Sequence, residues 1–179
     1  FKYLPMWGVE KVNFTLAAGK RQDLPDIDLL RAVAKVKVYL SNDMKRNGWS
    51  IHSMQLFNYN KKGYCMPDKY TDCERTASLT HEEFEHFLES KQTDSITMNE
   101  NIPIYLPEYQ NKGQEDANKC IIKLKLARNG TVESYTLRFK EYTDEGKEND
   151  IVRDHYYIFE VYKGSNGQNL VKLTVKKWN

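Results

Sequence analysis

The sequence predicts a mainly β protein in which antiparallel strands pack as a sandwich. Three observations lead to this fold class. Segments that alternate apolar and polar residues recur along the chain, the dipeptide Asn129-Gly130 separates two of them, and one segment alone has convincing helical periodicity. Alternation is typical of strands that bury one face, and Asn-Gly between alternating runs is a strong hairpin signal. We expect the sandwich to form one or two lobes.

The segment at residues 27–40 gives the clearest strand. From residue 32 onward one face is apolar and carries Ala32, Ala34, Val36, Val38 and Leu40. The opposite face carries Val33, Lys35, Lys37 and Tyr39. One apolar face and one lysine-bearing face suit an antiparallel sheet that covers a core. A helix is the competing interpretation, because Ala, Leu, Arg and Lys favour helices, but the β-branched residues and the period of two favour a strand.

Other strands are predicted on both sides of this segment. They span residues 12–16, 49–59, 102–107, 119–126, 131–142, 151–163 and 170–178. The apolar segment 1–8 contains Pro5, which cannot donate a hydrogen bond to a sheet, so this segment is expected at an edge or a bulge. Residues 42–48 are predicted to form a turn.

The one predicted helix spans residues 80–90. Thr80 and Glu83 fit a capping box, and Phe84, Phe87 and Leu88 then share one helical face. The polar residues 89–101 follow and are the best candidate for a boundary. We therefore expect an N-terminal lobe at residues 1–98 and a C-terminal lobe at residues 99–179.

Composition excludes several function classes. The chain has 179 residues, a formal net charge of +2 and 12 tyrosines, and its lysines are dispersed among acids. Nucleic-acid binding needs a concentrated basic face, so we expect no nucleic-acid partner. The sequence has no apolar run of the roughly 18 residues that a transmembrane helix needs, and no signal peptide or lipid-bearing N-terminal cysteine. It begins at Phe1 rather than Met, which we interpret as processing or trimming, so the missing signal says little about the compartment.

Three cysteines leave the thiol chemistry open. Cys65 and Cys73 flank a loop and are a candidate disulfide if their Cα atoms come within about 7 Å, and free thiols are the alternative. Their spacing, like the single Cys120, does not match a zinc site. His81 and His86 resemble a zinc-protease helix at first, but they are five residues apart rather than four and would lie on different sides of a helix. We predict no metal site.

No catalytic constellation is apparent. Arg153-Asp154-His155 could suggest acid–base chemistry, but no serine or cysteine nucleophile lies in an activating motif. We interpret these residues as a turn that leads into a strand. The sequence therefore predicts a protein that is not an enzyme and uses no cofactor.

The tyrosines permit a binding surface. Seven of them lie in the C-terminal half: Tyr105, Tyr109, Tyr135, Tyr142, Tyr156, Tyr157 and Tyr162. Exposed rings could stack on sugars, which makes a carbohydrate-binding module the second hypothesis for the function. Cross-strand packing explains the same residues equally well.

The order of several segments resembles a known family. The segments are YLPMWG (3–8), LLRAVAKVKVYL (29–40), IHSMQLFNYNKKGYCMP (51–67), IPIYLPEY (102–109) and DIVRDHYYIFEV (150–161), followed by NLVKLTVKKW (169–178). In this order they resemble the fimbrillin family of Bacteroidales surface proteins, which includes type V pilus subunits and adhesin-like relatives. The RAVAKV strand, the N-Y-N-x-x-G-Y turn and the R-D-H-Y-Y segment carry the resemblance over most of the chain.

The resemblance implies a fold and a place in the cell. It implies two transthyretin-like β-sandwich lobes, a precursor exported as a lipoprotein, and a final location on the cell surface or outer membrane. Its partners would be other fimbrial subunits, and an adhesin would also hold a host or bacterial surface ligand. The family's R-N-H-x-Y block appears here with Asp154 in place of asparagine, and the family's usual lipoprotein signal and further N-terminal strands are not present.

The resemblance also implies assembly by β-strand exchange, in which an incoming strand completes a sandwich that lacks one. The candidate donor strand comprises Leu170, Val171, Leu173, Val175 and Trp178. The candidate groove or edge comprises Tyr3, Leu4, Met6 and Trp7. The alternative for residues 169–178 is an ordinary last strand that pairs with residues 156–163 of the same chain.

Overall fold

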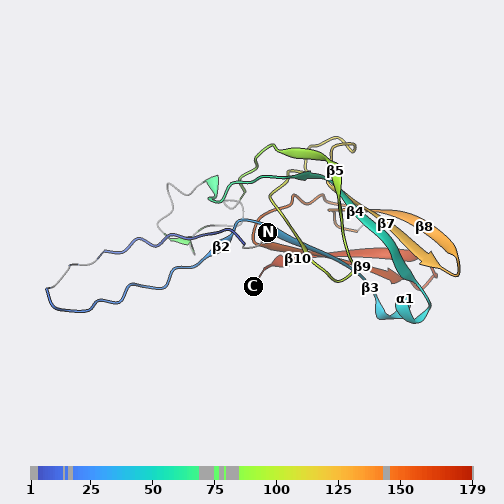
Figure 1. The fold of residues 1–179 in the computed structure, drawn as a ribbon, viewed down its shortest axis with the longest axis horizontal. Coiled ribbons are helices and arrows are strands. Elements are labelled where there is room, and N and C mark those ends of the chain that lie inside the picture. Colours follow the sequence, from blue (N-terminus) through green and yellow to red (C-terminus); the bar gives the residue numbers. More distant parts are fainter. Residues whose placement is uncertain are drawn as a thin grey trace.

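Two four-stranded sheets face each other in the computed structural model (Figure 1). The model describes residues 4–13, 15, 18–68, 75, 76, 79, 85–142 and 146–178. The first sheet has the order β10 (Asn169–Lys177), β9 (His155–Lys163), β3 (Ala34–Leu40), β6 (Ile104–Leu106). The second has the order β5 (Lys91–Thr97), β4 (Ser50–Asn60), β7 (Ile121–Arg128), β8 (Thr131–Arg138). The mainly β prediction is confirmed.

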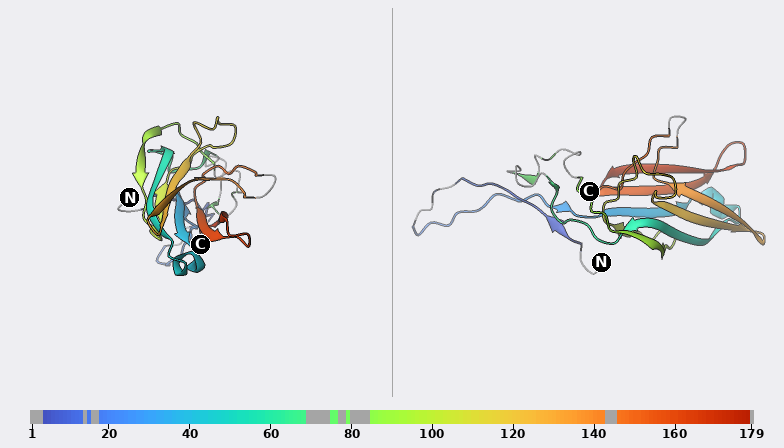
Figure 2. Two further views of the ribbon diagram at one scale, coloured as in Figure 1. Left: turned by 90° about the vertical axis from the view of Figure 1, so that its right-hand side faces the viewer. Right: turned by 90° about the horizontal axis from the view of Figure 1, so that it is seen from above.

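A long arm leaves one end of the sandwich. It is formed by residues 9–29 and lies between two short paired strands, β1 (Met6–Trp7) and β2 (Leu30–Arg31). Figures 1 and 2 show its two limbs running outward and back, well beyond the sheets. The strand predicted at residues 12–16 is wrong for Val12, Asn13 and Thr15, which belong to no strand, and its other two residues lie outside the described part of the chain.

The alternating segments form strands as predicted. Along β3, Ala34, Val36, Val38 and Leu40 are all buried, and the residues between them are half-buried. The β7–β8 hairpin turns at Asn129 and Gly130, whose φ angles are 49° and 80°. Positive φ at both central residues is what a tight hairpin of this twist requires, and Asn-Gly accepts it readily.

One topological expectation needs correction. The sandwich is not wholly antiparallel, because β3 pairs with β9 in parallel, from Lys35 opposite Tyr156 to Leu40 opposite Val161. The long connection that parallel strands need is supplied by the intervening chain, which builds the whole second sheet. Both sheets combine strands from before and after residue 98. The division into lobes at residues 98 and 99 stays a prediction. The transthyretin-like arrangement stays a prediction.

The helix lies elsewhere than predicted. Helix α1 (Asn42–Arg46) occupies the segment predicted as a turn, and the Ser41 hydroxyl accepts a hydrogen bond from the Met44 N–H at its start. Of the helix predicted at residues 80–90, residues 80–84 lie outside the described part and residues 85–90 are not helical. The polar stretch interpreted as a boundary contains β5, a polar edge strand with no buried residue.

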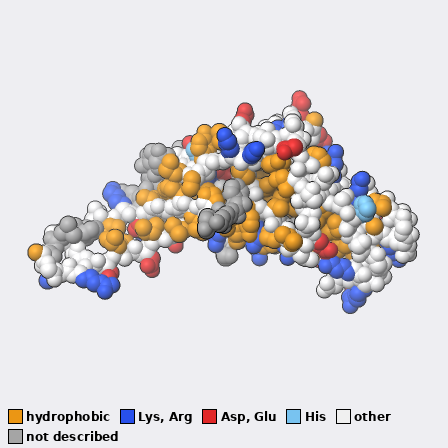
Figure 3. Space-filling view, in the orientation of Figure 1, with side chains coloured by type: hydrophobic (Ala, Val, Ile, Leu, Met, Phe, Trp, Pro, Cys, Tyr) orange, Lys and Arg blue, Asp and Glu red, His pale blue; other side chains and the backbone are white. Residues whose placement is uncertain are grey.

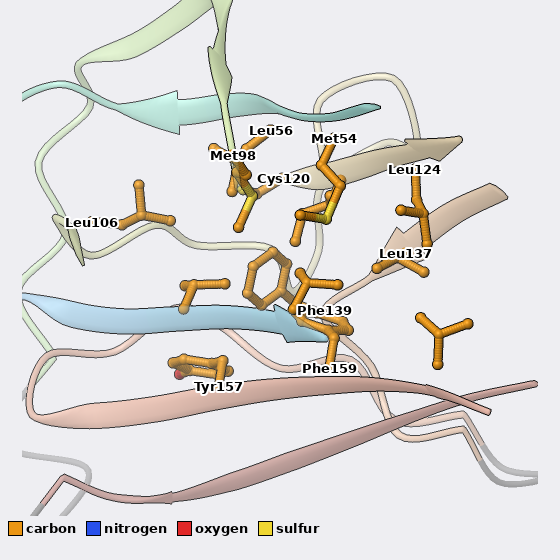
Figure 4. Close-up of a cluster of buried hydrophobic side chains, with 14 of the residues drawn as sticks. Met54, Leu56, Met98, Leu106, Cys120, Leu124, Leu137, Phe139, Tyr157 and Phe159 are labelled. Atoms are coloured by element: carbon orange, nitrogen blue, oxygen red, sulfur yellow. The ribbon is translucent and has the colours of Figure 1, made fainter. Parts of the chain in front are cut away.

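The core fills the space between the two sheets. Figure 4 shows Met54, Leu56, Leu124 and Leu137 of the second sheet facing Tyr157 and Phe159 of β9. Phe139 packs edge-on against both aromatic rings, with ring centroids 5.5 Å and 5.1 Å away, a preferred geometry for aromatic pairs. One buried cluster therefore joins both sheets.

Candidate functional site

The R-D-H-Y-Y segment forms a buried turn at the end of the sandwich from which the arm projects. Arg153 is fully buried and donates hydrogen bonds to Oε2 of Glu108 at 2.8 Å, to the Cys65 carbonyl at 2.7 Å and to the Tyr64 carbonyl at 3.0 Å. The Arg153 backbone N–H also donates to Glu108 Oε1 at 3.2 Å. The Arg153 side chain thus holds both Glu108 and the loop that contains Tyr64 and Cys65, which are distant in the sequence.

The N-Y-N-x-x-G-Y turn also contacts Glu108, through the backbone of that residue. Asn60 donates to the Glu108 carbonyl at 2.7 Å and accepts from the Ser90 N–H at 3.0 Å. Gly63 lies against Pro107 so closely that a Cβ at position 63 would be 2.9 Å from the Pro107 Cβ. The segments that carry the family resemblance therefore meet in space, and we call this end of the molecule the motif end.

Burial controls the ionisation of this network. Burial raises the pKa of Glu108, and the Arg153 guanidinium opposes that shift. The Tyr157 hydroxyl donates to the Asp150 carbonyl at 2.7 Å and accepts from the Val152 N–H at 2.9 Å, and burial raises the pKa of Tyr157. Since a buried polar group is costly unless it is hydrogen-bonded, these contacts hold loops together and give the network a structural role. The sequence analysis missed Glu108 because its partner is 45 residues away.

A second set of contacts holds the end of β10. Asp154 has a φ of 55°, a left-handed conformation that Asp and Asn adopt more readily than other non-glycine residues. Its carboxylate pairs with Arg31 at 3.0 Å, and its carbonyl accepts a hydrogen bond from the Trp178 N–H at 2.8 Å. Arg31 also donates to the Trp178 carbonyl, and its guanidinium lies 4.7 Å from the Trp178 ring centroid. The ring stacks on Tyr105 at 5.4 Å. We call these four residues the Trp178 clasp.

The candidate donor strand is an edge strand of this structure. Strand β10 pairs antiparallel with β9, from Asn169 opposite Lys163 to Lys177 opposite His155. Val171 and Leu173 pack against the core, whereas Leu170 is 37% exposed and Val175 38% exposed. The alternative predicted for residues 169–178, pairing within the chain, is what the structure shows. Donation to another subunit stays a proposal.

The candidate N-terminal edge is described in part. Tyr3 lies outside the described residues, Leu4 is half-buried and Met6 is exposed. Trp7 packs against Leu30 and Val152. A largely apolar cavity of about 400 Å³ lies nearby, lined by Pro5, Ala32, Val33, Lys61, Lys62, Gly63, Tyr64, Cys65, Leu88 and Pro107. The edge and the cavity together form a concave surface at the motif end.

The tyrosines do not form one surface. Tyr109 and Tyr157 are buried, which removes them from the predicted stacking set. Tyr135 lies on β8, on the other sheet, and Tyr142 follows that strand. The remaining three, Tyr105, Tyr156 and Tyr162, lie on strands β6 and β9 of the first sheet. Lys35 lies 4.5 Å from the Tyr156 ring centroid, so that ring face is already in contact with a cation.

The remaining candidate residues are placed as follows. Cys65 is exposed and its sulfur lies 3.6 Å from the Met6 carbonyl, whereas Cys73 lies outside the described residues, so their disulfide stays a prediction. Cys120 is buried, and burial raises the pKa of its thiol. His86 stacks on Tyr64 with ring centroids 3.7 Å apart.

Metal-binding clusters and membrane-spanning helices are both absent from the described residues. They contain no group of three or more His, Cys, Asp or Glu side chains placed to hold a metal ion. None of the helices in this part of the chain has the length and apolar character needed to cross a membrane.

Comparison with known families assigns the chain. The family described as "Fimbrillin-A associated anchor proteins Mfa1 and Mfa2" matches residues 2–179. The chain belongs to this Mfa family. Its members are fimbrial proteins that associate with other fimbrial subunits, and they are structural proteins rather than enzymes. No curated protein sequence matches the chain.

Several solved structures are similar to this chain at low sequence identity. The tip fimbrial protein Mfa3 of Porphyromonas gingivalis has a TM-score of 0.51 and 17% identity, over 84% of this chain and 52% of its own. A protein described as a cell adhesion protein from Parabacteroides distasonis has a TM-score of 0.51 and 13% identity, over 86% and 54%. The fimbrilin FimA of P. gingivalis has a TM-score of 0.47 and 11% identity, over 91% and 64%. The chain thus spans about half the length of the first two structures.

Proposed function

We propose that the chain is a non-enzymatic fimbrial subunit or adhesin of the cell surface that assembles with other fimbrial subunits by β-strand exchange, with β10 as the strand that moves. The observation that carries this proposal is the position of β10. It lies at the edge of its sheet and pairs with β9 alone among the described strands. An edge strand can leave a sheet without breaking the other strand pairs.

The chemistry of β10 suits an exchanged strand. Val171 and Leu173 face the core, and the alternate residues Lys172 and Lys176 lie on the outer face. Removal of β10 would leave the opposite edge of β9, away from β3, without hydrogen-bond partners and would uncover apolar core beside it. A strand of the same pattern from another subunit would satisfy both, as in known modes of strand addition.

The Trp178 clasp is the element that would control this exchange. It attaches Trp178, the residue that follows the strand, to Arg31, Tyr105 and Asp154 through a stacked ring, a cation–π contact and two hydrogen bonds to the Trp178 backbone. A strand held at one end by few side chains can dissociate from that end first. We therefore infer that release of Trp178 precedes release of β10.

A reversible lock tests the proposal. Thr174 and Ile158 are directly opposite in the β10–β9 ladder, so Thr174→Cys with Ile158→Cys can join the strands by a disulfide. Cys65 and Cys73 would be replaced by serine in the same chain. Oxidation is expected to abolish the oligomers or fibres that form by exchange of β10, so that size-exclusion chromatography and electron microscopy show less assembly, and reduction is expected to restore it.

The matched control joins a hairpin that the proposal leaves intact. Lys125→Cys with Ser134→Cys links β7 to β8, which are also directly opposite. This lock should leave assembly unchanged. Equal assembly of the oxidised and reduced β10–β9 variant would refute donation of β10. A chain ending at Gly167 adds a second readout: it should bind a peptide of residues 168–179 if the gap beside β9 accepts a strand.

Three finer parts of the proposal depend on the family resemblance. The concave surface around Met6 and Trp7 is the second candidate edge for an incoming strand. The precursor would be exported as a lipoprotein. Adhesion would add a host or bacterial surface ligand, and a carbohydrate held by exposed tyrosines is the alternative function. Glycan binding that is lost with Tyr105→Ala or Tyr156→Ala, in a chain that does not assemble, would favour that alternative.

A further inference from the structure

The returning limb of the arm has apolar side chains that remain more than half exposed, although Ile27 and Leu29 lie against Gly8. This limb, residues 24–29 (Leu-Pro-Asp-Ile-Asp-Leu), leads back along the arm to β2 (Figure 1). Leu24, Ile27 and Leu29 are 64%, 52% and 57% exposed. Figure 3 shows hydrophobic side chains along this projecting part of the molecule. Exposed apolar groups that are gathered on one element indicate an interaction surface.

The acids of the limb are also unpaired. Among the described residues, Asp26 and Asp28 form no ion pair, whereas Asp23 at the tip pairs with Arg21 at 2.9 Å. In an extended segment, successive side chains point to opposite sides. The limb therefore presents Asp26 and Asp28 on one side and Ile27 and Leu29 on the other.

The outer edge of β10 has the complementary pattern. Lys172 and Lys176 lie on the outer face of the sheet, and Leu173 and Val175 lie on the inner face. Among the described residues neither lysine has a carboxylate partner. The neighbouring acid on this face, Glu160 of β9, lies directly opposite Lys172 in the ladder, but the two form no ion pair in the described structure.

Space remains on the inner side of this edge. A cavity of about 290 Å³ adjoins β10 and is lined by residues that include Val175, Val152 and Tyr157. No strand of the described structure pairs with β10 on the side away from β9. An added strand would meet unpaired backbone groups, lysines on one face and partly exposed apolar side chains on the other.

We propose that residues 24–29 of one copy of this chain add as a strand to the outer edge of β10 in a second copy. Asp26 and Asp28 pair with Lys172 and Lys176 on the outer face, while the apolar side chains of the limb cover Leu173 and Val175. This single contact would cover both the exposed limb at residues 24–29 and the unpaired edge of β10.

The spacing of the charges allows this pairing. Residues two apart on a strand are about 7 Å apart and residues four apart about 14 Å. Directly opposite residues of paired strands share a face, so one aspartate can lie opposite a lysine while the other lies opposite Thr174. The second lysine is then a diagonal neighbour about 7 Å away, which its flexible side chain can span. Cross-strand pairs of opposite charge and of apolar residues both stabilise such an addition.

The contact joins different surfaces of the two copies. It is therefore head-to-tail, and it builds a chain of subunits or a closed ring rather than a symmetric dimer. It uses the edge of β10 away from β9, so it does not depend on exchange of β10 and would persist if a neighbour supplied that strand.

Charge reversal with exchange between copies tests the contact in the full chain. Asp26→Lys with Asp28→Lys, or Lys172→Glu with Lys176→Glu, is expected to weaken self-association measured by sedimentation about tenfold or more, because like charges then face each other. A mixture of the two variants should associate again, since one copy supplies a basic limb and the other an acidic edge. Val175→Lys should also block association by placing a charge on the inner face.

Matched variants control for net charge. Lys123→Glu with Lys125→Glu reverses two lysines on the outer face of central strand β7, and Glu89→Lys with Glu115→Lys reverses two exposed acids elsewhere. Both should associate like the unmodified chain. Failure of the mixture to associate, unchanged association of either reversed variant, or a monomer at all concentrations would overturn the proposal. Equal losses in the control variants would show a general charge effect and would overturn it as well. The locked β10–β9 variant should retain this association, which separates the two proposals.

Discussion

The sandwich and the arm treat the same kinds of residue in opposite ways. In the sandwich, the alternating side chains of β3 are buried on one face, and Arg153 finds partners for its charge within the core. In the arm, Ile27 and Leu29 are more than half exposed and the nearby acids are unpaired. Burial of apolar area is the main favourable term in folding. The sandwich side chains therefore stabilise the fold, whereas those of the arm contribute little to it.

This difference separates folding residues from association residues. A change in the sandwich should lower stability whether or not the protein has a partner. A change in the arm should leave stability unchanged and alter only contacts with other molecules. The predictions below test that division, beginning with the largest expected effect.

Loss of the buried ion pair should have the largest effect. Arg153→Met leaves the Glu108 carboxylate buried without its cation, and such losses typically cost about 3–5 kcal/mol. Urea unfolding should show this as a lower midpoint. Adding Glu108→Gln to Arg153→Met removes the uncompensated charge, so the double variant should be more stable than the single one. Equal stability of the two variants would mean that the carboxylate is not held ionised by Arg153.

The sequence predicted much of the sandwich and little of this network. Alternation located β3, β4, β7, β9 and β10, because period two is a local property of strands that bury one face. The Arg153–Glu108 pair depends on segments that are far apart in the chain, and no local pattern reports such a contact. The same segments had carried the family resemblance, and the structure gives the physical reason: they meet at the motif end.

Removal of the clasp should have the second largest effect. Trp178→Ala removes a partly exposed ring that contacts Tyr105 and Arg31. The cost should be about 2 kcal/mol, below the 3–5 kcal/mol of a fully buried aromatic residue. Hydrogen exchange should accelerate in β10 more than in β3. Uniform acceleration across both strands would show that the clasp stabilises the whole sandwich rather than the end of β10.

The stability of the sandwich should also fall at alkaline pH through Tyr109. Burial raises the pKa of Tyr109 to about 12 from the ordinary value near 10. The folded protein therefore keeps this proton where the unfolded chain loses it, so stability is fully present below pH 10 and is lost as the pH rises towards 12. Tyr109→Phe has no such proton and should lose less stability over this interval. Urea midpoints at about pH 9 and about pH 11.5 test the difference. Equal losses of stability in the unmodified protein and in Tyr109→Phe would contradict the raised pKa of Tyr109.

The elements that sequence analysis missed are those without one apolar and one polar face. Strand β5 is an edge strand with no fully buried residue, and only Ile96 packs against the core, so its sequence resembled a linker. Helix α1 has five residues, too few to establish a helical period, although Ser41 supplies a capping signal. The parallel pairing of β3 and β9 could not be inferred, because alternation gives the faces of a strand but not the identity of its neighbours.

The smallest effect is expected in the arm, and it is the most informative. Ile27→Ser should change the free energy of unfolding by less than about 0.5 kcal/mol, as is usual for exposed positions. Ile122→Ser is the matched control, since Ile122 is fully buried between the sheets; loss of a buried isoleucine side chain typically costs about 2–5 kcal/mol. Self-association should depend on Ile27 even though stability does not. Ile27→Ser should therefore weaken self-association in a chain that remains folded. A large loss of stability from Ile27→Ser would show that the arm folds against the sandwich, and the division between folding and association residues would then fail at this limb.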